Sequence, residues 1–346
     1  MMKSQQRYTF PFTWPWAFLV ACLALTSPVR AGEWEMIMDL SSKWKFSIGD
    51  DPAWSSPTFP DDDWERIAVP SSWEEEGFHG YNGYAWYRTS FRVPKQHIGT
   101  QMYLSLGYID DADEVYLNGK LLGFSGGFPP HYYTAYNAAR RYLIPDELIR
   151  DNGENVIAVR VYDSQLNGGI VGGRIGLMTR KTSVQMVRDL QGVWEFAPGD
   201  NLNWAVPYEY EPEWHSIMVP DAWDNQGYKD LDGFAWYRKF FFMGPSEYTE
   251  PLILVMGRID DWDEVYVNGR LVGKTGDMNL VGRESPTASV HRKFRAYILP
   301  KAVLDESGCN ILAVRVFDGD YTGGIYQGPV GIIRKADYSR FMRKWR

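Results

Sequence analysis

Short stretches in which apolar and polar residues alternate occur along most of the chain, and they predict β-strands. Residues 102–106 read Met-Tyr-Leu-Ser-Leu, and residues 156–161 follow the same pattern in part. An Asn-Gly pair at residues 118–119, and another at 268–269, lies between two such stretches and predicts a tight hairpin of type I′. No long stretch before the C-terminal end has the 3.6-residue period of an amphipathic helix. The pattern therefore predicts an all-β fold of short strands, a sandwich or a jelly roll.

The C-terminal end has a different pattern, typical of a short helix. Apolar residues recur there with the spacing i, i+3, i+4 and i+7, which places them on one face: Tyr338, Phe341, Met342 and Trp345. We describe residues 339–346 as a basic helical tail, because four of them are Arg or Lys. Two interpretations remain open: the helix packs on its own domain, or it docks on a partner.

Most of the chain repeats itself, which predicts two similar domains. Residues 109–123 read IDDADEVYLNGKLLG and residues 259–273 read IDDWDEVYVNGRLVG, with eleven identical positions among these fifteen. Earlier motifs recur at the same offset of 150 residues, and later motifs recur at 155, so the second copy has gained five residues in a surface loop. We expect two tandem domains, residues 33–182 and 183–338, called the first copy and the second copy below.

The first 31 residues predict an export signal. Lys3 and Arg7 give a positive start, an apolar stretch follows, and small residues near Ala31 suit signal peptidase. A second interpretation is lipidation of Cys22, which follows Leu-Val-Ala as in a bacterial lipobox. In both cases we expect an exported protein that is periplasmic, secreted or lipid-anchored at the cell surface. Contact with a membrane is expected only through a lipid on Cys22.

Composition and charge narrow the classes of function. The formal net charge of -8 argues against an electrostatic nucleic-acid binder. The 2 cysteines cannot form a disulfide scaffold. Aromatic residues make up 16% of the chain, but much of this richness arises because core tryptophans such as Trp73 and Trp86 recur in the second copy.

The repeated motifs resemble a known module. They are V-P-x-x-W, G-x-x-W-Y-R, I-D-D-x-D-E-V-Y-x-N-G-x-L-x-G, Y-x-x-P, G-x-N-x-x-A-V-R-V and G-G-I. This series is similar to the sugar-binding jelly-roll domain of family-2 glycoside hydrolases and to the β-domain of sialate O-acetylesterases. The resemblance covers nearly all of the chain after the signal, twice. It implies two tandem galactose-binding-like jelly-roll domains that bind carbohydrate.

The sequence departs from these families where their catalytic residues lie. The glycoside hydrolases carry two catalytic glutamates on a (β/α)₈ barrel of roughly 250 residues, and no span of that size remains here. We find neither the Gly-Asp-Ser motif nor the Asp-x-x-His of the esterases. The resemblance therefore implies the accessory module without its enzyme, and no catalytic residue is assigned.

An acidic group in each copy is the strongest alternative candidate for chemistry. If residues 109–117 form one strand, Asp110 and Asp111 point to opposite faces, while Asp111 and Asp113 share a face about 6.5–7 Å apart, a separation compatible with an inverting glycosidase. Asp113 also shares its face with core residues and needs a buried partner. We expect Arg88 or Arg160 to supply it.

Structural hydrogen bonding is the favoured role of these acidic residues, ahead of ligand contact, a bound structural calcium and catalysis. No other metal site and no cofactor are predicted. The equivalent basic partners in the second copy are Arg238 or Arg315. The predicted polar group comprises Asp111, Asp113, Arg88 and Arg160, with Asp261, Asp263, Arg238 and Arg315 in the second copy.

Aromatic residues in two loops of the first copy are the candidates for sugar contact. Sugar rings lay their apolar faces on aromatic rings, while their hydroxyls bind polar side chains. Residues 78–84 and 128–136 supply such a mixture, and the matching loops of the second copy are less aromatic. The alternative is that these side chains pack within the protein. The candidates are Tyr81, Tyr84, His131, Tyr132, Tyr133 and Tyr136.

Together these observations predict an exported, non-catalytic carbohydrate-binding protein whose partner is a glycan or oligosaccharide. A first alternative is a scaffold or accessory subunit that packs on a separately encoded glycoside hydrolase or esterase. A second alternative is a minimal glycosidase of family 2.

Overall fold

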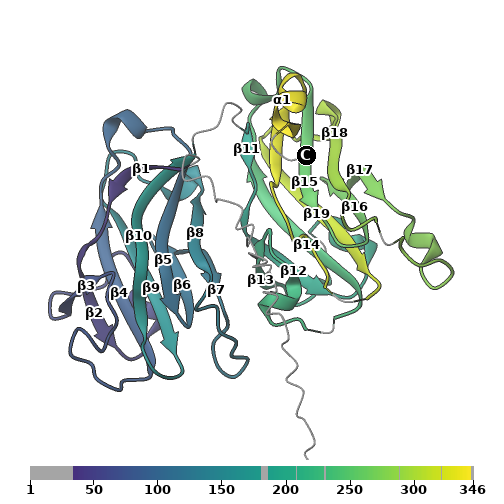
Figure 1. Ribbon diagram of the computed structural model, residues 1–346. Coiled ribbons are helices and arrows are strands. Elements are labelled where there is room, and N and C mark those ends of the chain that lie inside the picture. The colour runs from purple at the N-terminus through teal and green to yellow at the C-terminus, as the bar shows by residue number, and fades with distance from the viewer. Residues whose placement is uncertain are drawn as a thin grey trace, which may run out of the picture. The chain divides into compact units, whose positions relative to one another are not determined.

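Antiparallel β-strands make up nearly all of the regular structure (Figure 1). The computed structural model describes residues 34–180, 186–207, 209–229, 231–287, 289–320 and 322–343. The expected all-β fold is confirmed, with one short α-helix near the C-terminal end. Residues 1–31, predicted as a signal, lie outside the described residues, as does Cys22. Within the described part, no helix is both long and apolar enough to cross a membrane.

The first copy contains a four-stranded and a six-stranded sheet. The four-stranded sheet has the order β1-β10-β5-β8, formed by Trp34–Asp39, Gly169–Arg180, Met102–Asp110 and Ala139–Ile144. The six-stranded sheet has the order β3-β2-β4-β9-β6-β7, formed by Glu65–Val69, Ser42–Ile48, Gly83–Phe91, Asn155–Asp163, Ala112–Leu117 and Lys120–Ser125.

The second copy has the same strand order in both of its sheets. The four-stranded sheet is β11-β20-β15-β18, formed by Arg188–Asp189, Gly331–Arg334, Leu252–Arg258 and Phe294–Leu299. The six-stranded sheet is β13-β12-β14-β19-β16-β17, formed by His215–Val219, Gly192–Pro198, Gly233–Phe242, Cys309–Asp318, Trp262–Val267 and Arg270–Thr275.

Short 3₁₀-helices lie in the connections. Those of the first copy are η1 (Pro52–Ser55), η2 (Lys95–His97) and η3 (Asp146–Leu148). Those that follow are η4 (Leu202–Ala205), η5 (Trp223–Gln226), η6 (Pro245–Tyr248), η7 (Met278–Leu280), η8 (Lys301–Val303) and η9 (Lys335–Asp337). The enlarged loop predicted in the second copy runs between β17 and β18 and contains η7.

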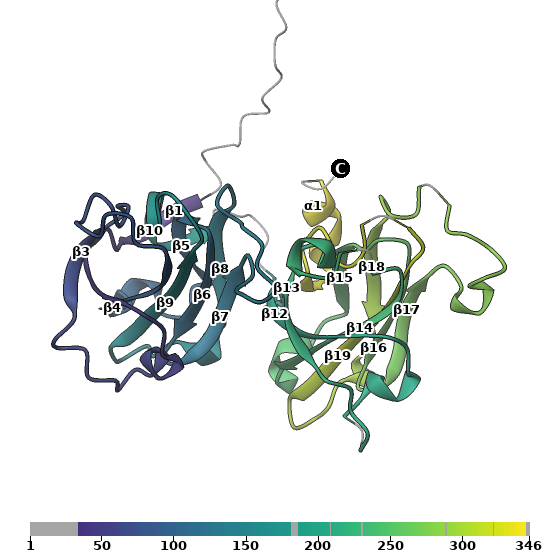
Figure 2. The same cartoon turned by 90° about the horizontal axis from the view of Figure 1, so that it is seen from below.

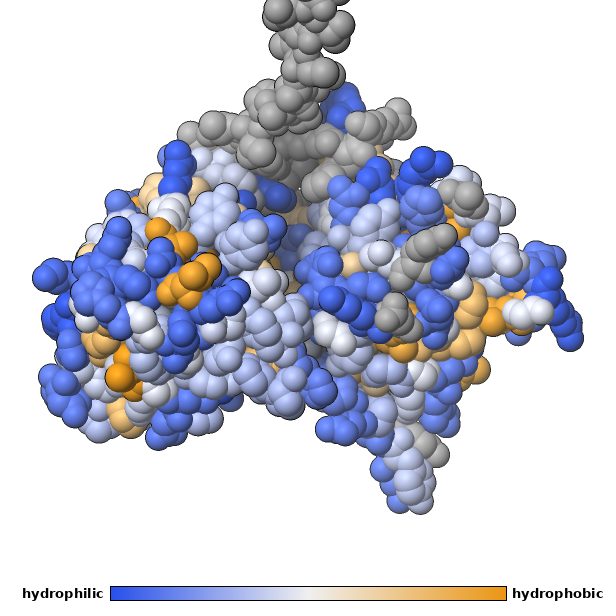
Figure 3. All heavy atoms as spheres, turned by 60° about the horizontal axis from the view of Figure 1, so that its bottom comes forward, coloured by the Kyte–Doolittle hydropathy of each residue, from blue (hydrophilic) through white to orange (hydrophobic). Residues whose placement is uncertain are grey.

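The core of the first copy lies between its two sheets, because both sheets contribute buried side chains to one cluster. Tyr87 and Val159 come from the six-stranded sheet, and Leu104 and Leu177 come from the four-stranded sheet. Each such side chain contributes about 1.5–3 kcal/mol when it is fully removed from water. Figure 3 agrees with this segregation, since hydrophilic residues predominate on the face that it shows.

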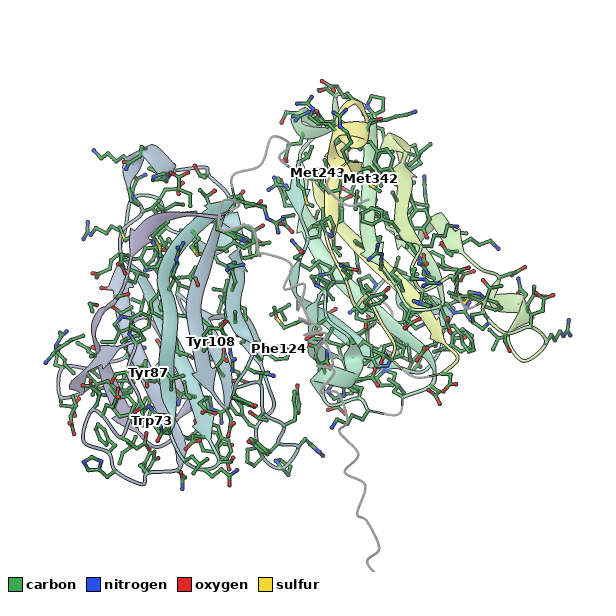
Figure 4. All side chains as sticks on the ribbon, in the orientation of Figure 1. Trp73, Tyr87, Tyr108, Phe124, Met243 and Met342 are labelled. Atoms are coloured by element: carbon green, nitrogen blue, oxygen red, sulfur yellow. The ribbon has the colours of Figure 1, made fainter. Side chains whose placement is uncertain are left out.

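Two tryptophans predicted as core residues are fully buried, each at 0% exposure. Trp73 belongs to the cluster between the sheets, and its indole N–H donates to the hydroxyl of Tyr87 at 2.6 Å (Figure 4). Trp86 lies on the opposite face of β4, where it stacks on Tyr116. The prediction that both are buried is therefore confirmed.

The predicted Asn-Gly hairpins are also confirmed. Asn118 (φ 52°) and Gly119 (φ 81°) connect β6 to β7, and Asn268 and Gly269 connect β16 to β17 with φ angles of 49° and 74°. Positive φ at both central residues defines the type I′ turn, and Asn and Gly are the residues that tolerate it best.

The α-helix α1 (Tyr338–Met342) packs on the four-stranded sheet of the second copy (Figure 1, Figure 2). Phe341 lies in a cluster with Ile253 and Val255 of β15 and Ile333 of β20. Packing on its own domain is thus the interpretation that the described residues support. Trp345, the fourth residue of the predicted apolar face, lies outside the described residues.

Candidate functional site

The acidic motif of the first copy lies where the chain passes from one sheet to the other. β5 ends at Asp110 in the four-stranded sheet, and β6 begins at Ala112 in the six-stranded sheet. The expectation that one strand keeps Asp110 and Asp111 on opposite faces is therefore wrong. Instead, carboxylate oxygens of Asp110, Asp111 and Asp163 lie within 4.8 Å of one another. We call these three residues the first acidic cluster.

Asp111 is held in place by four hydrogen bonds. Thr134 Oγ1 donates to Asp111 Oδ1 at 2.5 Å, and Tyr132 OH donates to Oδ2 at 2.7 Å. The backbone N–H and the hydroxyl of Ser164 also donate to Oδ2, at 3.1 and 2.8 Å. Burial by itself would raise the pKa of Asp111, but these hydrogen bonds outweigh it and lower the pKa to about 2. Asp111 is therefore a fixed negative charge.

The other two members of the first acidic cluster have raised pKa values. Burial raises the pKa of Asp110 to about 7, and the adjacent Asp111 adds to the shift. Burial also raises the pKa of Asp163 to about 6. Asp163 is 0% exposed, its Oδ1 accepts one hydrogen bond from the N–H of Gln165, and its Oδ2 has no hydrogen-bond partner.

The second copy repeats this arrangement with fewer donors. Asp260, Asp261 and Asp318, the second acidic cluster, also have oxygens within 4.8 Å of one another. Burial raises the pKa of Asp260 to about 6 and that of Asp318 to about 7. Gly319 stands where the first copy has Ser164, so only its backbone N–H donates to Asp261 Oδ2, at 2.9 Å. Burial raises the pKa of Asp261, in contrast to Asp111.

Asp113 has a different buried partner from the two that the sequence suggested. Arg140 Nε donates to its Oδ1 and Tyr142 OH to its Oδ2, both at 2.6 Å, and the side chains of Asp113 and Arg140 are each 0% exposed. Arg140 lies on β8, so the ion pair joins the two sheets across the core. Because Asp113 is enclosed in this way, it cannot flank a water-filled cleft together with Asp111, as a glycosidase pair must.

Arg88 and Arg160 were the wrong partners because their side chains lie on the outer face of the six-stranded sheet. The residues next to Arg88 on β4 and next to Arg160 on β9 point into the core, so the two arginines point outward. The side chain of Asp113 points inward, away from them. Arg88 Nε instead donates to Asp61 at 2.7 Å. Arg160 binds Asp50 through Nε at 2.7 Å and Glu114 through Nη1 at 3.2 Å.

The second copy needs the same correction. Asp263 pairs with Arg295, whose Nε donates to Oδ1 at 2.9 Å between side chains that are 0% exposed. Arg238 instead binds Glu195 at 2.7 Å and Glu211 at 2.9 Å. Arg315 binds Asp200 at 2.7 Å and Glu264 at 3.0 Å.

Two of the predicted aromatic residues meet beside the first acidic cluster. Tyr84 and Tyr132 both pack on Tyr162, with ring centroids 4.8 and 5.6 Å away, and Phe128 lies 5.6 Å from Tyr84. The guanidinium of Arg160 lies over the rings of Tyr84 and Phe128 at 4.7 and 4.4 Å. We call Tyr84, Phe128, Tyr132 and Tyr162 the aromatic group.

The remaining aromatic candidates have other surroundings. Tyr81 packs on Trp73, and its hydroxyl donates to the carbonyl of Tyr84 at 2.6 Å, so it supports its own loop. Tyr133 is half-buried and pairs through its backbone with Gly127. His131 and Tyr136 are both exposed to solvent, Tyr136 to 57%.

Several residues of this site were not singled out from the sequence. They are Asp163 of the acidic cluster, the donors Thr134 and Ser164, the rings Phe128 and Tyr162, and the core partner Arg140. One signal was available for Asp163, since the motif Ala-Val-Arg-Val-Tyr-Asp ends at this residue and its second copy ends at Asp318.

Comparison with known proteins defines the class of the first copy. Residues 49–167 match the family described as "Beta-galactosidase second all-beta domain". Over 140 residues the chain is 30% identical to "Beta-galactosidase BoGH2A" of Bacteroides ovatus. This first copy therefore contains an all-β domain related to those of family-2 glycoside hydrolases. The similar stretch covers 37% of this chain and 15% of BoGH2A, so the chain matches only a small part of that protein's length.

Solved structures of similar proteins include a β-glucuronidase of Bacteroides uniformis. It has 15% sequence identity and a TM-score of 0.37, over 84% of this chain and 28% of that one. Another is a family-2 glycosyl hydrolase of Bacteroides cellulosilyticus, with 16% identity and a TM-score of 0.36, over 82% of this chain and 31% of that one.

Proposed function

We propose that this chain is a non-catalytic carbohydrate-binding protein and that it holds its glycan at the first copy. The aromatic group offers ring faces for the apolar side of a sugar, and Asp110, the partly exposed member of the first acidic cluster, offers carboxylate oxygens for its hydroxyls. The relation of residues 49–167 to a β-galactosidase domain supports a carbohydrate as the ligand.

The observation that carries this proposal is the position of Tyr132. Its side chain is 38% exposed, while its hydroxyl donates to Asp111 at 2.7 Å and its ring packs on Tyr162. A partly exposed ring that is fixed at both ends loses little conformational freedom when a ligand binds, which favours affinity. Tyr132 thus presents part of its ring to solvent, while the buried Asp111 holds its hydroxyl in place.

The second copy offers a weaker version of this surface. Phe234 and Phe317 take the positions of Tyr84 and Tyr162 and pack at 5.0 Å. Among the described residues, no tyrosine hydroxyl donates to Asp261. We therefore place the ligand in the first copy.

We further propose that residues 33–182 and 183–338 are two jelly-roll domains of the galactose-binding type. The identical strand orders of the two copies support this division. The likeness to the β-domain of sialate O-acetylesterases remains a prediction from the sequence motifs.

Titration calorimetry with oligosaccharides chosen from a glycan array tests the function. We expect saturable binding that Tyr132→Ala weakens about five- to tenfold, since a ring contact of about 1–1.4 kcal/mol corresponds to that change in affinity. Tyr132→Phe keeps the ring and removes the hydrogen bond to Asp111, so it should weaken binding less. Tyr210→Ala is the matched control, because Tyr210 is 70% exposed in the second copy. Failure of the folded protein to bind any glycan would refute the proposal.

A role beside a separate enzyme is the second candidate, and the family match favours it because the matching domain is part of a β-galactosidase. In this role the chain would co-elute with a separately encoded glycoside hydrolase and would itself release no product from chromogenic β-galactosides. Turnover by the purified chain, lost in Asp111→Asn, would instead support a minimal glycosidase.

We also propose export, on the basis of the sequence pattern of residues 1–31. The intact mass of the mature protein distinguishes cleavage after Ala31 from a lipidated Cys22.

A further inference from the structure

Four buried carboxylate oxygens among the described residues lack a hydrogen-bond partner: both oxygens of Glu74, and two that belong to equivalent aspartates of the two copies. The aspartate oxygens are Oδ2 of Asp163 at the end of β9 and Oδ2 of Asp318 at the end of β19, and both aspartates are 0% exposed. A buried charged oxygen without a partner costs several kcal/mol, so proteins seldom keep one unless it has a ligand or is neutralised. Here the unusual feature occurs at the same position of both copies.

Each of these aspartates lies close to two more carboxylates. Oxygens of Asp110 and Asp111 lie within 4.8 Å of Asp163, and oxygens of Asp260 and Asp261 lie equally close to Asp318. Like charges at this separation repel one another, which adds to the cost of burial. A cation between the three carboxylates would replace their mutual repulsion by attraction to the cation and would offset the cost of burying them.

We propose that each acidic cluster binds one Ca²⁺ ion. Carboxylates are the hard oxygen ligands that Ca²⁺ prefers, and three of them with water can supply its usual six to eight oxygens. Ca²⁺ accepts irregular ligand geometry, whereas Mg²⁺ demands a near-ideal octahedron, which favours Ca²⁺ for a cluster drawn from strand ends and a connection.

The hydrogen bonds around the first cluster fit such a role. Thr134, Tyr132 and Ser164 all donate to Asp111, so this carboxylate is fixed in orientation. Outer donors of this kind orient the ligands of metal sites. Asp261 accepts a hydrogen bond from the backbone of Gly319, and we therefore expect the second cluster to bind Ca²⁺ less tightly.

The positive charges nearby are engaged elsewhere. Arg140 Nε is bound to Asp113, and its Nη2 donates to the backbone carbonyl of Asp111 rather than to a cluster carboxylate. Arg295 has the same two contacts with Asp263 and the carbonyl of Asp261. These arginines therefore stabilise the neighbouring core pair and donate no hydrogen bond to the cluster carboxylates.

Both proposals involve the first acidic cluster, so titration calorimetry of the EDTA-treated full chain with CaCl₂, in the absence of any glycan, tests Ca²⁺ binding separately. We expect two Ca²⁺ ions per chain, with one site lost in Asp163→Asn, the other lost in Asp318→Asn, and both lost in the double variant. At saturating Ca²⁺ the melting temperature should rise on the order of 5 °C. Asp62→Asn is the matched control, because the side chain of Asp62 is fully exposed.

Absence of saturable Ca²⁺ binding by the folded chain would overturn the proposal, as would two sites retained in the double variant. Tighter binding of Mg²⁺ than of Ca²⁺ would overturn the choice of ion. A single site that only Asp163→Asn removes would overturn the assignment of the second cluster. Near-UV circular dichroism verifies that each variant is folded, and Asp110→Asn and Asp260→Asn provide replacements at the same clusters should either first variant fail to fold.

Discussion

Aspartates two positions apart in one motif have opposite surroundings. Asp111 accepts hydrogen bonds from three side chains at the strand ends, whereas Asp113 is enclosed in the core with Arg140 and Tyr142. Burial raises the pKa of Asp113, while hydrogen bonds hold that of Asp111 at about 2. The residue type alone therefore says little about role, because the environment sets the charge.

Removal of Asp113 should be strongly destabilising. Asp113→Ala leaves the Arg140 guanidinium buried without its carboxylate, and we expect the free energy of unfolding to fall by about 3–5 kcal/mol. Urea denaturation followed by circular dichroism measures the change. Asp62→Ala, at a fully exposed position, should change it by less than about 0.5 kcal/mol. Similar midpoints for the two variants would contradict the buried ion pair.

At the scale of elements, the connections decide where chemistry can lie. The passage from β5 to β6 brings Asp110 and Asp111 to the end of β9, and the loop between β7 and β8 brings Tyr132 and Thr134 to the same place. The Asn-Gly hairpins are placed by local backbone preference, whereas α1 is placed by its contact with β15 and β20. A short helix of this kind is stable only through such packing.

The apolar face of α1 should contribute to stability and not to a partner contact. Phe341→Ala removes a ring that is 6% exposed and leaves a cavity against Ile253 and Ile333, so we expect a loss of roughly 3 kcal/mol. Thermal and urea unfolding of the full chain measure this loss. Arg340→Ala, on the exposed side of the helix, is the control. Unchanged stability of Phe341→Ala would favour the docking interpretation.

At the scale of the whole molecule, the two copies have the same strand order and separate main core clusters. Each copy comprises about 150 residues, enough to bury a sufficient core by itself. The two copies differ in the side chains around the acidic clusters. For example, the first copy has Ser164 where the second has Gly319. The strand order is therefore the same in both copies, while the side chains around the two acidic clusters differ.

Residues 33–182 produced alone should fold. We expect a single cooperative unfolding transition in circular dichroism and a monomeric elution volume, because both sheets that enclose the first core lie within this piece. Glycan affinity should equal that of the full chain if the first copy holds the site. An unfolded or aggregated product, compared with residues 183–346 made in parallel, would show that the copies depend on each other.

The sequence alone determined the strands and the Asn-Gly hairpins, because these depend on a two-residue period and on local backbone preference. It also indicated the burial of Trp73 and Trp86, because both recur at equivalent positions of the second copy. The repeated motifs are also visible in the sequence. Only the tertiary structure decided that Asp113 pairs with Arg140, and that Asp163 joins Asp110 and Asp111. These residues come from different strands, and the first pair from different sheets, so their meeting depends on how the sheets pack and not on spacing along the chain.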